Sequence, residues 1–266
     1  MPFTATHVAA VLPLARAPLV ASALVIGSMA PDLPHFLPVL VGAAVTHSPG
    51  GVVSVDVALG LGVFLVWHGI LSRPALASAP AALRGRVGAQ ATPGLRTRMS
   101  SPRRVLMVLV SLSVGAATHV VWDAFTHAGR WGTTLVPWLA REHGLFAGYT
   151  WAQYGSGVFG GLVVTLWLAR WWRSTSSVPS APGLRPEVAA GAWLSVLLAG
   201  AAGAAAGSVG PLTSPGGPDL RAAFFSAVTL GPAVAGVVAL LLAVIWHLLV
   251  GSDRPPTVGQ AKDKNA

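Results

Sequence analysis

Residues 105–128 read VLMVLVSLSVGAATHVVWDAFTHA. This segment is apolar over most of its length and exceeds the roughly 20 residues that a helix needs to cross a bilayer. Two imidazoles and one carboxylate interrupt it, at His119, Asp123 and His127. Ionisable side chains at membrane depth are costly, so they usually mark a functional site. The segment therefore predicts a membrane-spanning helix that carries a polar site.

The spacing of these three residues suggests what the site could bind. On a helix they fall within a sector of about 80°, and neighbouring members lie about 6 Å apart along the axis. His and Asp are suitable ligands for zinc and similar divalent metals. His119 and His127 would be about 12 Å apart on a straight helix, too far for one ion. A metal site and a hydrogen-bonded polar seam between helices both account for the pattern.

The composition extends the membrane assignment to the whole chain. Of its 266 residues, 53% are hydrophobic and 9% are charged, whereas soluble domains carry about 25% charged residues. The net charge of +9 does not indicate a nucleic-acid partner, because seven of the 17 basic residues lie in one acid-free stretch at 73–104. Such a stretch is typical of a cytoplasmic loop beside anionic lipid. The absence of Cys excludes disulfides and thiolate ligands.

We expect an all-α, polytopic helical membrane protein with about five full spans. The candidate spans are Val52–Ser72, Val105–Ala128, Trp151–Trp171, Val188–Val209 and Phe224–Val250. The N-terminal segment His7–Met29 is interrupted by Pro13, Arg16 and Pro18. Proline disrupts helices, so we predict a pair of short or re-entrant helices there.

The domain organisation follows from these segments. We predict one integral membrane domain over residues 1–250, in which 1–173 is the candidate metal-site half and 188–250 forms scaffold helices. The segment 251–266 is polar and charged and is expected to be a disordered cytoplasmic tail.

The positive-inside rule then orients the chain in the plasma membrane. Basic residues at 73–104, at 170–185 and in the tail place those segments in the cytoplasm. Five spans with a cytoplasmic C-terminus leave the N-terminus outside. This topology also places three charged residues, Arg130, Arg141 and Glu142, outside the cell. The two arginines there run against the positive-inside rule.

This orientation gathers the scarce ionisable residues on the outer side. The chain has only six Asp and two Glu, and two of the Asp belong to a series with four His. The members of this series are His7, Asp32, His47, His119, Asp123 and His127. His35, His68 and Gln153 are candidates for supporting positions around them, and Asp56 is expected to cap a helix N-terminus.

Several motifs together resemble one bacterial family, catalogued as domain of unknown function 4184. They are Met1-Pro2-Phe3-Thr4, Gly27-Ser28-Met29-Ala30-Pro31-Asp32-Leu33, Thr46-His47-Ser48, Thr118-His119-Val120-Val121-Trp122-Asp123-Ala124-Phe125-Thr126-His127 and Gln153-Tyr154-Gly155-Ser156. More distantly, the order of His and Asp is similar to membrane-bound metal-dependent hydrolases and to the zinc-dependent phospholipase C and single-strand nuclease superfamily.

The distant resemblance implies metal ligation by His7, Asp32, His47, His119 and Asp123, with His127 as a further ligand. The phospholipases also use an N-terminal Trp and a late His-x3-Glu pair. This chain begins with Met1-Pro2 and has no such pair, so we expect one or two metals and not three.

The resulting hypothesis is a membrane-embedded hydrolase that uses a divalent metal, with zinc expected, and has Asp32 or Asp123 as its base. Its expected substrate is a lipid or lipid-like envelope amphiphile with a phosphoester or related bond. Two alternatives remain open: a metal- or proton-coupled transporter, and a scaffold with a vestigial metal site. The sequence does not indicate an oligomeric state.

Overall fold

The computed structural model describes residues 4–37, 39–88, 94–179 and 183–250, so the predicted tail at 251–266 lies outside the described residues. In chain order the elements are η1 (Thr4–His7), α1 (Val8–Val11), η2 (Leu12–Leu14), α2 (Ala21–Gly27), η3 (Ala30–His35), α3 (Ala43–Thr46), α4 (Pro49–Val53), α5 (Val55–Val66), η4 (Trp67–Leu71), α6 (Ser72–Ser78), α7 (Ala81–Val87), α8 (Leu95–Arg98), α9 (Pro102–Thr126), α10 (Trp131–Leu135), α11 (Pro137–Ala140), β1 (Glu142–His143), β2 (Phe146–Ala147), α12 (Gly148–Ser174), α13 (Pro186–Leu212) and α14 (Leu220–Val250). The elements η1 to η3 are 3-10 helices, and η4 is a π-helix.

Five helical segments are long and apolar enough to cross a membrane. They are Pro49–Ser78, Pro102–Thr126, Gly148–Ser174, Pro186–Leu212 and Leu220–Leu249. The first consists of α4, α5, η4 and α6 in succession. Each of the five predicted spans corresponds to one of these segments, and the N-terminal region forms short helices, as expected. The predicted all-α polytopic fold is confirmed.

The core lies where α2 and α5 pack against α9. Its buried side chains are Ala23, Ile26, Phe64, Val108 and Leu112. The backbones of α2 and α9 approach closely, because a Cβ on Gly115 would lie 2.7 Å from the backbone nitrogen of Ser28. Small residues at a helix interface permit such contact. The end of α2 is therefore held directly against the second half of α9.

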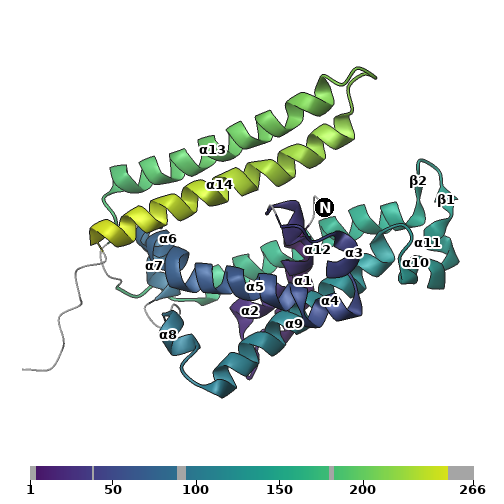
Figure 1. Cartoon of the computed structure of the whole chain (residues 1–266). Coiled ribbons are helices and arrows are strands. Elements are labelled where there is room, and N and C mark those ends of the chain that lie inside the picture. The colour runs from purple at the N-terminus through teal and green to yellow at the C-terminus, as the bar shows by residue number, and fades with distance from the viewer. Residues whose placement is uncertain (1–3, 38, 89–93, 180–182, 251–266) are drawn as a thin grey trace, which may run out of the picture.

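Two further contacts complete the half of the fold that contains the predicted site residues. Helix α12 packs against η1, where a Cβ on Gly160 would lie 2.9 Å from the carbonyl oxygen of Thr6. Between α9 and α12 the chain forms α10, α11 and the antiparallel pair β1–β2, which lie together at one end of the molecule (Figure 1).

Helices α13 and α14 form an antiparallel hairpin beside the other helices (Figure 1). Gly203 and Gly207 bring them together, since a Cβ on either would lie 2.9 Å from a carbonyl oxygen of α14. The hairpin contacts the first span through α6 and η4. There the Nε2 of His247 lies 2.9 Å from the carbonyl oxygen of Ile70. The hairpin carries none of the predicted metal ligands.

Candidate metal centre

Asp32 is held by the short helix η3. Pro31 and Pro34 shape this 3-10 turn, and Asp32 lies in its first turn with no exposed surface. The hydroxyl of Thr4, in η1, donates to Oδ2 of Asp32 at 2.5 Å. This bond occupies one carboxylate oxygen and leaves Oδ1 directed elsewhere.

His47 is held at the junction of α3 and α4. Ser48 caps α4 by accepting a hydrogen bond from the backbone N–H of Gly51 at 3.0 Å, and Pro49 occupies the first helical turn. The Nδ1 of His47 lies 3.1 Å from the carbonyl oxygen of Ala43. A carbonyl only accepts, so Nδ1 donates this hydrogen bond, and Nε2 is the ring nitrogen that faces the cluster.

His119 and Asp123 project from the second half of α9, one turn apart, and both are buried. The Nδ1 of His119 lies 2.8 Å from the carbonyl oxygen of Ser28, at the end of α2. By the same reasoning Nδ1 donates this hydrogen bond, and Nε2 is the ring nitrogen that faces the cluster. A backbone carbonyl on the second ring nitrogen is the usual support of a metal-binding histidine. Both histidines therefore direct the other ring nitrogen, Nε2, towards the cluster, as metal ligation requires.

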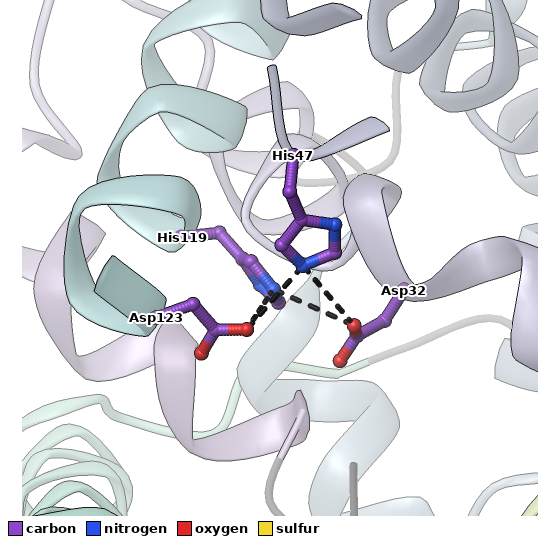
Figure 2. A group of neighbouring side chains, drawn as sticks. All are labelled: Asp32, His47, His119 and Asp123. Atoms are coloured by element: carbon purple, nitrogen blue, oxygen red, sulfur yellow. Dashed lines mark ion pairs between the residues drawn. The ribbon is translucent and has the colours of Figure 1, made fainter. Parts of the chain in front are cut away.

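These four side chains converge from three separate parts of the chain (Figure 2). The Nε2 of His47 lies 3.8 Å from Oδ1 of Asp32 and 3.3 Å from Oδ2 of Asp123. The Nε2 of His119 lies 3.6 Å and 3.4 Å from the same two oxygens. One ligand atom from each residue falls within 4.8 Å of every other.

The cluster fits a divalent ion on two independent grounds. First, zinc bonds of about 2.0–2.2 Å place tetrahedral ligands roughly 3.3–3.6 Å apart, close to the four distances above. Second, three of the converging atoms, Oδ1 of Asp32, Nε2 of His119 and Oδ2 of Asp123, are buried without a hydrogen bond. Buried polar atoms are normally paired, and a metal ion would satisfy all three at once. Two imidazoles with two carboxylates form a donor set that zinc accepts.

His7 and His127 flank this cluster on the other oxygen of Asp123. The Nε2 of His7 lies 3.5 Å and the Nδ1 of His127 3.4 Å from Oδ1 of Asp123. The ring of His7 stacks on that of His119, with centroids 3.9 Å apart. His127 does not continue the helical series, because α9 ends at Thr126 and the backbone of His127 is extended. All six residues of the predicted series thus lie together, four converging directly and two beside them.

The three predicted supporting residues differ in position. Gln153 joins the site, since its Nε2 lies 2.6 Å from Nε2 of His127. His35 packs edge-on against Phe225 of α14, with ring centroids 5.5 Å apart. His68 instead pairs with Ser22, 2.9 Å from its hydroxyl, at the opposite end of α2 from the cluster.

Asp56 does not have the capping role expected from the sequence. Ser54 precedes the first residue of α5, and Asp56 lies inside its first turn with no exposed surface. Neither of its carboxylate oxygens has a hydrogen bond within the described residues. The helix begins earlier than the sequence indicated, and α5 packs against η3.

The residues outside the spans have protonation states that suit metal binding. Burial, together with the charge of His119, lowers the pKa of His7 to about 3, so this imidazole is neutral at pH 7. Burial raises the pKa of Asp32, but the nearby His119 and the hydrogen bond from Thr4 outweigh it, and the pKa lies below its usual value. Metal ligands must be deprotonated, and both residues meet that condition.

A small pocket borders the cluster at His7 and Asp123, with a volume of about 10 Å³. Its other lining residues are Thr6, Trp122, Thr126, His127, Gln153, Ser156 and Gly157. A volume of about 10–15 Å³ holds one water molecule. The pocket therefore places a water-sized space beside His7 and Asp123.

Residues 1–245 match the profile of a protein family described as Domain of unknown function (DUF4184). Because the match spans nearly the whole chain, the chain belongs to this family, as its motifs indicated. No curated protein and no solved structure matches it.

Proposed function

We propose that this member of the family is a membrane-embedded metal-dependent hydrolase, that its metal is zinc, and that it cleaves a phosphoester or related bond of a lipid or envelope amphiphile. The convergence of Asp32, His47, His119 and Asp123 within 4.8 Å carries the proposal. Convergence of buried His and Asp side chains from separate elements is typical of a metal site and is not needed for helix packing.

A bound divalent ion would supply Lewis acidity and lower the pKa of water towards neutrality. The two candidate bases differ in what they can do. Asp32 bonds to Thr4 through its second oxygen, so it serves as a ligand. Asp123 directs its second oxygen towards His7 and the water-sized pocket, where it can orient water and accept a proton. His7 is neutral at pH 7, and its Nε2 lies 3.5 Å from Oδ1 of Asp123, so it helps to hold this carboxylate in place.

An amphiphilic substrate is supported by the surface next to this pocket. An apolar groove of about 460 Å³ runs along α9 and α1, lined by Ala10, Val114, Ala117, Thr118, Val121 and Trp122. Trp122 also lines the small pocket at Asp123, so the groove and the cluster adjoin. An acyl chain lying in the groove would bring its head group to the ligands. With the basic stretch 73–104 in the cytoplasm, the site lies on the outer face and the C-terminus is cytoplasmic.

The transporter alternative has less support. It requires polar groups along the full depth of the protein. His68 is the buried ionisable residue towards the other end, but Phe64 packs against its ring at 4.5 Å and has no exposed surface. The apolar core around Phe64 and Leu112 separates His68 from the cluster.

The first experiment measures metal content and hydrolysis together. Protein purified without chelators should carry one zinc per chain, and His119→Ala should lose it. Wild type should hydrolyse a member of a panel of phosphodiester and phosphomonoester lipids in detergent. Asp123→Asn should reduce the rate by about 10–100-fold or more, because the change removes the charge but keeps the size.

Asp219→Asn is the matched control. Asp219 is exposed, accepts a hydrogen bond from the backbone N–H of Ala222 at the start of α14, and is not a member of the cluster. This variant should retain both metal and rate. A wild type that binds no zinc would contradict the site, and a zinc-loaded wild type that cleaves nothing would contradict the hydrolase assignment.

A further inference from the structure

A second cavity opens beside the cluster, on the side of His47. It has a volume of about 210 Å³ and is lined by His47, Val120, Ala124, Gly129, Arg130 and Trp131. Because His47 belongs to both, a molecule in this cavity would contact a residue of the metal cluster. The space is about twenty times larger than the water-sized pocket at Asp123, whose volume is about 10 Å³.

The chain folds back after α9 to place Arg130 there. Gly129 has a φ of +69°, a left-handed conformation that favours glycine. The following helix, α10, then packs tightly on α9, since a Cβ on Gly132 would lie 2.5 Å from the carbonyl oxygen of Ala124. Arg130 directly precedes α10 and so lies over the last turns of α9.

The charge of this cavity is positive. Arg130 is the only Arg or Lys among its lining residues, and no carboxylate lines it. Within the described part of the chain, the guanidinium of Arg130 makes no hydrogen bond or ion pair, although the residue is partly buried. The neighbouring Trp131 is half exposed and packs against Phe125 with ring centroids 5.2 Å apart. Tryptophan favours the interface between membrane and water, where lipid head groups lie.

The net charge of the metal cluster and Arg130 indicates which anion the cavity would bind. The carboxylates of Asp32 and Asp123 would offset the charge of one divalent ion, and histidine ligands bind a metal as neutral imidazoles, which add no charge. Arg130 then supplies one surplus positive charge. A phosphodiester carries one negative charge, and the planar guanidinium can bind two of its oxygens at once.

We propose that this cavity is the subsite for the phosphodiester group of the substrate and that Arg130 binds its anionic oxygens. The inference rests on the proposed hydrolase function and narrows it to phosphodiesters. Arg130 could not be assigned a role from its position in the chain, because its proximity to His47 depends on the turn at Gly129.

Binding is measured separately from turnover to test this subsite. Dimethyl phosphate, a soluble phosphodiester monoanion, is titrated calorimetrically into zinc-loaded protein in detergent. A second titration uses mixed micelles that contain phosphatidylglycerol. Arg130→Gln should weaken binding of dimethyl phosphate, of the lipid, or of both by about tenfold or more while zinc content is unchanged, because a charge-assisted bond is lost. Arg130→Lys should retain part of the affinity.

Arg141→Gln is the control, because Arg141 is exposed on the same outer segment and does not line the cavity. It should bind both ligands as wild type does. If only the lipid binds, and does so in an Arg130-dependent manner, the subsite recognises the phosphodiester within a lipid.

The two proposals can fail separately. Wild type that binds either ligand through Arg130 but hydrolyses no lipid supports the subsite and contradicts the hydrolase. Wild type that hydrolyses a phosphodiester lipid with the same KM as Arg130→Gln overturns the subsite and leaves the hydrolase standing. Wild type that binds neither ligand also overturns the subsite.

Discussion

Asp123 contacts four histidines of the candidate site, two through each carboxylate oxygen. Its Oδ2 lies between His47 and His119, 3.3 Å and 3.4 Å from their Nε2 atoms. Its Oδ1 lies between His7 and His127. A carboxylate that uses both oxygens in this way couples the metal cluster to the small pocket. An asparagine at position 123 would have the same shape but no negative charge, so it could not replace the carboxylate as a metal ligand or as a base.

Thr4 positions Asp32 through the hydrogen bond of 2.5 Å to Oδ2. Thr4→Val keeps the shape and removes the hydroxyl, so Oδ1 loses its fixed direction towards the histidines. We expect zinc affinity to fall by about 10–100-fold, as for other residues that orient metal ligands. Competition with a chelator of known affinity measures it.

The pH dependence of zinc binding provides a second measurement on the same variant. The Thr4 hydrogen bond lowers the pKa of Asp32, so the carboxylate stays ionised in mild acid. Without that bond the pKa rises, and zinc should be released at a higher pH than from wild type. Thr165→Val is the control, since its exposed hydroxyl bonds only within α12, to the carbonyl oxygen of Gly161. Equal zinc affinity and equal release pH in Thr4→Val and wild type would contradict this role.

At the residue scale, the sequence indicated the His and Asp residues of the site but not the backbone groups that orient them. Rare ionisable residues in an apolar chain stand out, so the six His and Asp could be found by type and spacing. The carbonyl oxygens of Ser28 and Ala43, which orient His119 and His47, have no side-chain signal. They belong to the backbone and become identifiable only when the helices are placed.

At the scale of elements, the contact between α2 and α9 determines the geometry of the cluster. Gly27 and Gly115 let the two backbones touch, and a Cβ on Gly27 would lie 2.9 Å from Cα of Leu112. The end of this contact is Ser28, whose carbonyl oxygen receives the Nδ1–H of His119. Helix packing and ligand orientation are therefore one structural feature.

Gly115→Ala tests this coupling. The added methyl group would lie 2.7 Å from the backbone nitrogen of Ser28, so α2 must move away from α9. Overpacking of this kind costs about 1–3 kcal/mol of stability. We expect a lower midpoint of thermal unfolding in detergent and, because Ser28 moves, a lower zinc content as well.

Gly62→Ala is the matched control, because its added Cβ would have no neighbour within 4 Å. The change should keep zinc content and stabilise α5 slightly, since alanine favours helices over glycine by about 0.5–1 kcal/mol. If Gly115→Ala binds zinc as wild type does, the packing of α2 does not control the site.

The membrane spans could be predicted from the length and hydropathy of apolar segments. The helix boundaries that depend on tertiary contacts could not. The five spans follow from apolar runs that nothing else explains. The π-helix η4 and the continuation of the first span from Ser72 to Ser78 do not follow from the sequence. Similarly, the end of α9 at Thr126 removes His127 from the expected helical face. A helix boundary depends on caps and packing that a periodic pattern does not contain.

At the scale of the whole molecule, the candidate site and the basic residues lie at opposite ends of α9. His119 and Asp123 lie in its last turns, whereas Arg103 and Arg104 lie in its first. The α13–α14 hairpin stands beside this arrangement without contributing a metal ligand (Figure 1). The orientation of one helix in the membrane would therefore decide which side the site faces.

Cysteine labelling can determine that orientation, because the natural sequence has no Cys. Leu145→Cys places a thiol in the exposed turn between β1 and β2, and Thr97→Cys places one in the exposed end of α8, within the basic stretch. The positive-inside rule predicts that a membrane-impermeant maleimide labels Leu145→Cys in intact cells, and Thr97→Cys only after permeabilisation. Both variants must retain zinc for the comparison to report the native fold. The reverse labelling pattern would place the cluster on the cytoplasmic face and exclude envelope lipids of the outer leaflet as substrates, while the metal chemistry of Asp32, His47, His119 and Asp123 would remain possible there.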